Sequence, residues 1–80
     1  MRYTLSKQAA KYLLHCDQTT RDKLRRALKS LTSWDGNIVK LRGYDNSYRL
    51  KIEHYRVLFS LQDDGTARVT EINTRTNIKY

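Results

Sequence analysis

Proline is absent from this sequence, glycine occurs three times and cysteine once. Because so few residues interrupt regular structure, no stretch is typical of a flexible linker, and the 80 residues predict a single small domain, 1–80. The lone Cys16 excludes a disulfide framework and a cysteine-based metal site, which suits a reducing cytoplasm. The N-terminal residues lack an apolar run long enough for a signal peptide or a transmembrane helix. We therefore expect a soluble cytoplasmic protein without a cofactor.

Acidic residues are also scarce, since 8 Asp and Glu stand against 16 Lys and Arg, for a net charge of +8. In so small a chain this excess predicts a polyanionic partner: nucleic acid, an anionic membrane surface or an acidic protein. Charge alone does not choose among the three. The two histidines, His15 and His54, lack the spacing of metal ligands, so no metal site is predicted.

Residues 48–59, YRLKIEHYRVLF, carry the clearest pattern in the chain. Apolar and charged residues alternate in the first half, which is typical of a strand with one buried face. If Glu53 and His54 form a turn, the two halves pair as an antiparallel hairpin with the apolar residues on one face. The other face then gathers three basic residues: Arg49, Lys51 and Arg56. Directly opposed like charges are unfavourable in a sheet. Because this face gathers them nevertheless, we predict that it binds an anion.

Helical periodicity predicts two helices before this hairpin. One covers residues 6–16 with Ser6 as its N-cap, and the second starts after Asp17 and ends near residue 33. The break between them is too short for anything but an antiparallel helical hairpin.

Short strands are predicted at both ends of the chain, over residues 2–5 and 67–73, with a loop or short extended piece near residues 38–41. Val69 and Ile72 cannot share a face without a bulge, so the register of the last strand stays open. The predicted fold class is α+β, a two-helix hairpin packed on a small antiparallel sheet in the order β-α-α-β-β-β.

Several sequence pieces resemble the RelE/ParE superfamily of bacterial toxins: YTLSKQAAKYL, KLRG, YRLK-x3-YRVLF, and INTR before a terminal Tyr. The resemblance covers nearly the whole chain and implies the same α+β fold. RelE-type toxins are ribosome-dependent endoribonucleases that cut messenger RNA in the ribosomal A site, whereas ParE-type toxins poison DNA gyrase. Both are neutralised by an antitoxin encoded beside them. The YRVLF segment favours the RelE type, because ParE-like chains more often have an aliphatic residue where Arg56 stands.

The resemblance implies a catalytic set on the central strands, at the end of the last strand and at the C-terminus: Arg49, Lys51, Arg56, Arg75 and Tyr80. The sequence departs from the family pattern in two places. Glu53 and His54 stand where the family often has Gly then Asp. Lys79 stands where it usually has Tyr, so that Tyr80 comes one step later.

Cleavage of RNA by its own 2′-OH requires removal of the hydroxyl proton, stabilisation of the charged phosphorane and protonation of the leaving 5′-oxygen. Arginine suits the second task, and Arg56 and Arg75 are the candidates for it and for assisting the leaving group. A lysine removes the proton only if its pKa is lowered, which nearby cations do, so Lys51 is the candidate base. The alternative is that these are solvated cations on an exposed sheet.

Further cations are predicted to contact ribosomal RNA or to form an ordinary solvated surface: Arg21, Lys23, Arg25, Arg26, Lys29, Lys40, Arg42 and Lys79. The expected partners are the ribosome, messenger RNA and a cognate acidic antitoxin, with no membrane and no small-molecule cofactor. The antitoxin segment is expected to be disordered when free, and to wrap the helices or add to a sheet edge. The alternatives are a ParE-like gyrase inhibitor without catalysis and a non-catalytic RNA-binding module.

Overall fold

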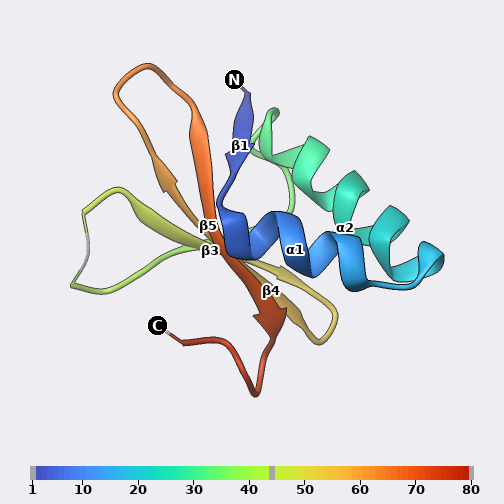
Figure 1. The fold of residues 1–80 in the computed structure, drawn as a ribbon. Coiled ribbons are helices and arrows are strands. Elements are labelled where there is room, and N and C mark those ends of the chain that lie inside the picture. The colour runs from blue at the N-terminus through green and yellow to red at the C-terminus, as the bar shows by residue number, and fades with distance from the viewer. Residues whose placement is uncertain (1, 44, 80) are drawn as a thin grey trace.

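The computed structural model describes residues 2–43 and 45–79, and it arranges two helices and five strands in two layers (Figure 1). The elements are β1 (Tyr3–Leu5), α1 (Lys7–His15), α2 (Gln18–Leu31), β2 (Asn37–Lys40), β3 (Ser47–Ile52), β4 (Tyr55–Leu61) and β5 (Ala67–Thr74). The strands form one sheet in the order β1-β5-β4-β3-β2, in which β1 runs parallel to β5 and the other pairs are antiparallel. The α+β class is confirmed, with β2 as an additional strand and a mixed rather than purely antiparallel sheet.

Both predicted N-caps are present. The Ser6 hydroxyl accepts a hydrogen bond from the backbone N–H of Ala9 at 3.1 Å, and the Asp17 carboxylate accepts one from that of Thr20 at 3.4 Å. Hydrogen bonding with the Thr20 side chain, and next with its backbone N–H, lowers the pKa of Asp17 below its usual value. Each cap satisfies an N–H group that the first helical turn leaves unpaired, which explains why the helices begin where they do.

The core lies between the helices and one face of the sheet. Its buried members come from α1, α2, β3, β4 and β5: Ala9, Leu13, Leu24, Leu28, Leu31, Leu50, Val57, Phe59, Ala67, Val69 and Ile72. The Trp34 ring closes one end of this core, with its centroid 5.0 Å from that of Tyr48 and 5.9 Å from that of Phe59. This packing holds Trp34 at a φ of +52°, a conformation that bulky residues rarely adopt.

The central hairpin has the predicted register. Leu50 pairs with Val57 and Ile52 with Tyr55, so that Glu53 and His54 form the turn. Glu53 has a φ of +53°, in the left-handed region. Its carboxylate lies 2.7 Å from the ammonium of Lys23 on α2, and this pair joins the hairpin to the helical layer.

A bulge resolves the register of β5. Leu58 pairs with Glu71 and Phe59 pairs with Val69, so Thr70 is the extra residue. Its hydroxyl donates to the Leu58 carbonyl oxygen at 3.2 Å. Val69 and Ile72 can therefore both face the core, which is possible only because the strand contains a bulge.

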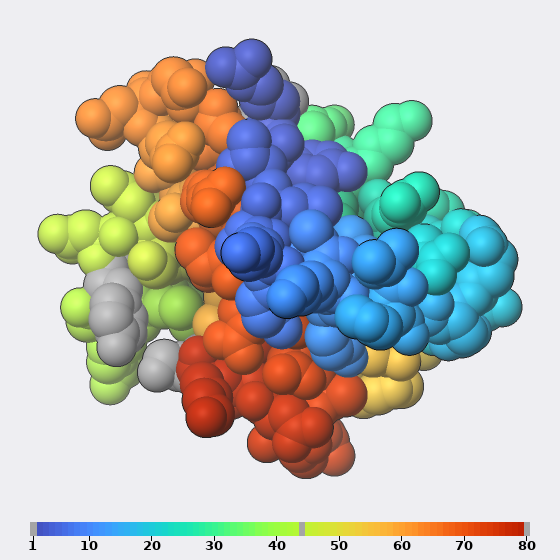
Figure 2. All heavy atoms as spheres, in the orientation of Figure 1, coloured from blue at the N-terminus to red at the C-terminus, as the bar shows by residue number. Residues whose placement is uncertain are grey.

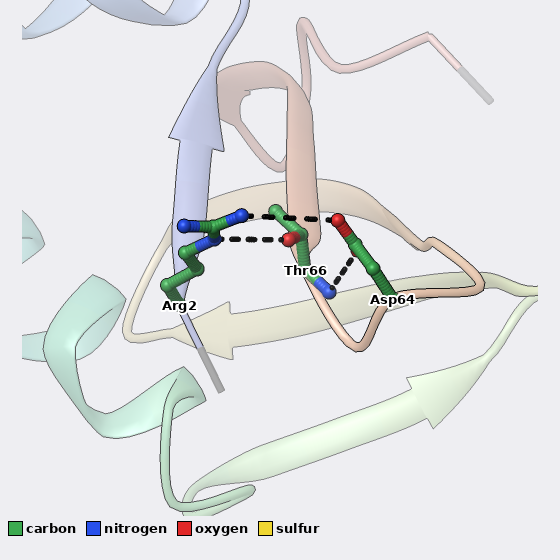
Figure 3. Close-up of polar contacts among 3 residues, drawn as sticks. All are labelled: Arg2, Asp64 and Thr66. Carbon is green, nitrogen blue, oxygen red and sulfur yellow. Dashed lines mark hydrogen bonds and ion pairs between the residues drawn. The ribbon is translucent and has the colours of Figure 1, made fainter.

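A small polar cluster fastens the N-terminus to the turn before β5 (Figure 3). The guanidinium of Arg2 donates to the Thr66 hydroxyl at 3.4 Å and lies 3.9 Å from the Asp64 carboxylate. The same carboxylate accepts the Thr66 backbone N–H at 2.9 Å. The cluster stabilises the β1–β5 edge, which brings together residues that are 64 apart in the chain.

The strained turn gives a first prediction. Glu53→Gly should raise the melting temperature by roughly 2–5 °C, because a left-handed φ disfavours every residue with a Cβ. Glu53→Gln, which removes the exposed ion pair but keeps the strained backbone, is the control and should melt close to the wild type. Thermal unfolding followed by circular dichroism measures both. A melting temperature of Glu53→Gly below that of the wild type would mean that the ion pair outweighs the backbone strain.

Candidate functional site

The candidate site is the sheet face turned away from the helices. Register places Lys51 directly opposite Arg56, and Arg49 opposite Leu58. These residues alternate with Leu50 and Val57, which point into the core, so the three cations share the other face as predicted. The structure thus brings together like charges that oppose folding, a cost that a bound anion would offset.

The three cations differ in exposure. Lys51 is exposed and Arg49 is half-buried, with its Nε atom fully buried. Arg56 is only 7 % exposed. The alternation in residues 48–59 predicts an exposed side chain on this face, and for Arg56 that prediction is wrong.

The burial of Arg56 has a local cause. Its Nη1 atom donates to the carbonyl oxygens of Glu53 at 2.9 Å and of Tyr55 at 2.8 Å. The guanidinium therefore lies against the turn that precedes Arg56. Both bonds use one nitrogen, whereas a guanidinium has five N–H donors in all. Arg56 therefore fixes the turn through Nη1, and the donors on Nε and Nη2 are not used in these two bonds.

Arg56→Ala should lower the free energy of unfolding by about 1–3 kcal/mol, because two hydrogen bonds from a charged donor are lost. Arg25→Ala, which shortens an exposed arginine on α2, should change it by less than about 0.5 kcal/mol. Urea unfolding of both variants measures the difference. Equal stability of the two variants would show that the Arg56 bonds contribute nothing to the fold.

Arg75 reaches the same end of the sheet. It follows β5 directly, its backbone N–H donates to the His54 carbonyl oxygen at 2.8 Å, and its side chain is exposed. The chain then turns back, with the N–H groups of Asn77 and Ile78 both bonded to the Thr74 carbonyl oxygen, and Ile78 is only 8 % exposed. The burial of Ile78 therefore places this part of the tail against the body of the protein. The remaining predicted residue of the catalytic set, Tyr80, lies outside the described residues.

Register adds two residues to this face that the sequence did not identify. Glu71 pairs with Leu58, and Asn73 pairs with Arg56. Both are half-buried, so a carboxylate and an amide lie among the cations. Their placement depends on the position of the bulge, and from the sequence the register of this strand stays open.

The cations predicted to bind RNA fall into three groups. Exposed side chains are those of Arg25, Arg26, Lys29, Lys40, Arg42 and Lys79. Lys40 and Arg42 line an open depression of about 480 Å³ on the loop between β2 and β3.

The other two groups are cations with partners inside the protein. Lys23 is paired with Glu53, and the hydrogen bond between them raises the pKa of Lys23. The Arg21 guanidinium donates to the carbonyl oxygens of Leu13, Leu14 and Cys16 at 2.9, 3.2 and 2.7 Å, so it caps the end of α1.

The histidines and the cysteine have local partners. His54 lies in the turn with its ring centroid 4.3 Å from that of Tyr55, and His15 Nδ1 lies 2.8 Å from the Lys11 carbonyl oxygen. The Cys16 thiol donates to the Tyr12 carbonyl oxygen, and burial raises the pKa of the thiol, so it is a poor nucleophile.

The part of the chain that the structure describes contains neither a metal-binding cluster nor a membrane-spanning helix. In residues 2–43 and 45–79, no cluster of three or more His, Cys, Asp or Glu is arranged to hold a metal ion. Over the same ranges, no helix is long and apolar enough to cross a membrane.

Comparison of the structure with solved structures identifies the fold. RelE in the archaeal RelE–RelB complex of Pyrococcus horikoshii is similar with a TM-score of 0.75 at 19 % identity, over 96 % of this chain and 97 % of that one. The isolated E. coli RelE toxin gives a TM-score of 0.74 at 20 % identity, over 90 % and 81 %. The RelB–RelE complex of Methanococcus jannaschii gives 0.73 at 22 %, over 90 % and 89 %. No protein-family model and no curated protein sequence matches the chain. The chain therefore has the fold of the RelE toxins, as its sequence pieces predicted.

Proposed function

We propose that this protein is the toxin of a toxin–antitoxin pair and a RelE-type endoribonuclease that cuts messenger RNA in the ribosomal A site. The observation that carries the proposal is the opposed pair Lys51 and Arg56 on the sheet face away from the helices, with Arg75 at the same end. The RelE fold and the +8 charge support it. A sheet that opposes two cations across neighbouring strands is suited to a polyanion whose charge they balance.

The three steps of RNA cleavage have candidates on this face. Lys51, exposed and directly opposite Arg56, is the candidate that accepts the 2′-OH proton. Arg56, held in one geometry by its bonds to the turn, stabilises the phosphorane. Arg75, at the exposed end of β5, assists the leaving 5′-oxygen. Arg49 adds a further phosphate contact.

The proposed partner is an acidic antitoxin. The similar chains from M. jannaschii and P. horikoshii are in complexes with RelB, and a +8 surface attracts an acidic chain. Long-range attraction speeds the encounter of opposite charges and salt screens it. The association rate constant should therefore fall at least about tenfold between 50 mM and 500 mM salt, as measured by stopped-flow fluorescence of Trp34. A rate constant that is flat with salt would exclude electrostatic recognition.

Induced expression with primer-extension mapping of cellular messages tests the proposal. The RelE reading predicts arrested growth with cuts at codon boundaries in translated messages. A DNA-damage response with intact messages would instead identify a gyrase inhibitor. Normal growth with intact messages would contradict the proposed toxin. The remaining function for the basic face would then be RNA binding without catalysis.

A further inference from the structure

Trp34 is a large aromatic side chain that the fold leaves partly uncovered. Its ring packs nearly perpendicular to those of Tyr48 and Phe59, yet 42 % of the residue is exposed. Its φ of +52° lies in the left-handed region, which disfavours bulky residues, and strained backbone of this kind is concentrated at functional sites. Part of an aromatic ring is thus held in one position at the surface.

Cations lie beside this ring on the side of β2. Lys40 is the register partner of Tyr48, so both side chains lie on the helical side of the sheet, where Trp34 packs against Tyr48. Lys40 and Arg42 are exposed, and both line the open depression on the loop between β2 and β3. Lys40 therefore adjoins the tyrosine on which the indole rests, and Arg42 follows it on the loop.

Further cations lie at the end of α2. Arg26 and Lys29, both exposed, line a second open depression, of about 450 Å³, together with Ser33, which directly precedes Trp34. The atoms near this end of α2, in green, stand out from the surface at the upper right (Figure 2). The exposed ring therefore has basic surface on both sides of it along the chain.

An exposed aromatic ring flanked by cations is suited to single-stranded nucleic acid, because a base stacks on the ring while the cations neutralise phosphates. Two carboxylates, those of Asp35 and Asp45, lie on the same turns, and the four cations outnumber them. An acidic peptide would need only the cations, whereas a nucleotide uses the flat ring as well. The combination therefore favours RNA over an acidic protein at this surface.

We infer that Trp34 is a stacking platform for an unpaired nucleotide of the RNA substrate, several nucleotides away from the cleaved bond, and that Lys40 and Arg42 bind neighbouring phosphates. The inference rests on the proposed function for the source of the RNA. Tyr48 faces the helical layer and Lys51 faces away from it, so the platform and the candidate site do not overlap. These two residues lie about 10 Å apart along β3. Single-stranded sites on small domains span about 4–16 nucleotides, so one RNA strand is long enough to contact both.

The emission of Trp34 tests the platform in the unaltered protein, because the chain has no other tryptophan. The probe is a 2′-O-methyl oligoadenosine of about ten nucleotides, which lacks the attacking 2′-OH, and its control is an abasic strand of the same length and charge. Stacking predicts that the oligoadenosine quenches the emission and that the abasic strand does not. Equal quenching by the two strands, or none by either, would overturn the inference.

Trp34→Leu removes the stacking surface but keeps an apolar side chain over the core, and Trp34→Phe is the matched variant that keeps an aromatic ring. Fluorescence anisotropy of the labelled strands measures binding. Trp34→Leu should bind the oligoadenosine about 5- to 100-fold more weakly than the wild type and the abasic strand equally well. Trp34→Phe should bind both strands much as the wild type does. Unchanged affinity of Trp34→Leu for the oligoadenosine, or an equal loss on both strands, would refute a stacked base.

Programmed ribosomes test whether the RNA is the substrate, with one message that ends just after the A-site codon and one that continues beyond it. Trp34→Leu should raise the protein concentration for half-maximal cleavage more on the longer message than on the short one. An equal increase on both, or no increase on the longer message, would exclude the message as the source of the nucleotide. Because probe binding does not depend on cleavage, a wild type that stacks the oligoadenosine but leaves every message intact contradicts the endonuclease and not the platform.

Discussion

Lys51→Arg should leave the protein folded and able to bind the ribosome, yet cleave messenger RNA about 10²- to 10⁴-fold more slowly. The substitution keeps the positive charge, but a guanidinium cannot lose its proton in a protein. It therefore removes the general base of the proposed reaction and leaves the charge of the site unchanged. Because Lys51 is exposed, the free energy of unfolding should change by less than about 0.5 kcal/mol.

Single-turnover cleavage on programmed ribosomes, with ribosome binding and thermal melts alongside, measures this effect. Lys11→Arg is the matched control, since it makes the same change at an exposed lysine of α1. A Lys51→Arg variant that cleaves at the rate of the control would remove Lys51 from the chemistry, and the carboxylate of Glu71 on the same face would become the next candidate base.

Val57→Asp should unfold the domain. Val57 is completely buried at the centre of β4, between β3 and β5, so the substitution places an unpaired charge in the core. The expected loss of about 4 kcal/mol or more is comparable to the whole stability of a chain of this length. Under the proposed function, growth arrest on expression should then be lost together with the cooperative melting transition.

Val39→Asp provides the comparison, because it makes the same chemical change on the edge strand β2, where the side chain is 42 % exposed. Its melting temperature should stay within a few degrees of the wild type. If Val57→Asp melted as Val39→Asp does, the assignment of alternating faces in the hairpin would be wrong, and the location of the basic face would fail with it.

The hairpin could be predicted from the sequence because its signal is local. Alternation in residues 48–52 specifies which side chains share a face, and the two-residue turn fixes the register, so Lys51 opposite Arg56 followed directly. The helices were equally accessible, since Ser6 and Asp17 mark their starts.

The parts that the sequence did not predict depend on distant or three-dimensional contacts. Nothing local in residues 3–5 indicates parallel pairing with β5, which lies more than sixty residues away. The burial of Arg56 depends on where the backbone carbonyls of the turn point, which follows from the left-handed φ of Glu53. The position of Glu71 depends on the bulge at Thr70. Polar side chains of the candidate site were therefore harder to place than apolar side chains of the core.

The central claim is that the basic sheet face cuts messenger RNA on the ribosome. The most direct measurement is single-turnover cleavage of one defined messenger by the purified wild-type protein, with and without ribosomes programmed with that messenger. The account predicts a cut at the A-site codon on ribosomes and cleavage at least about 10²-fold slower on free RNA, because positioning by the ribosome supplies the reactive geometry. An intact messenger on fully programmed ribosomes, at protein concentrations that arrest growth, would contradict it.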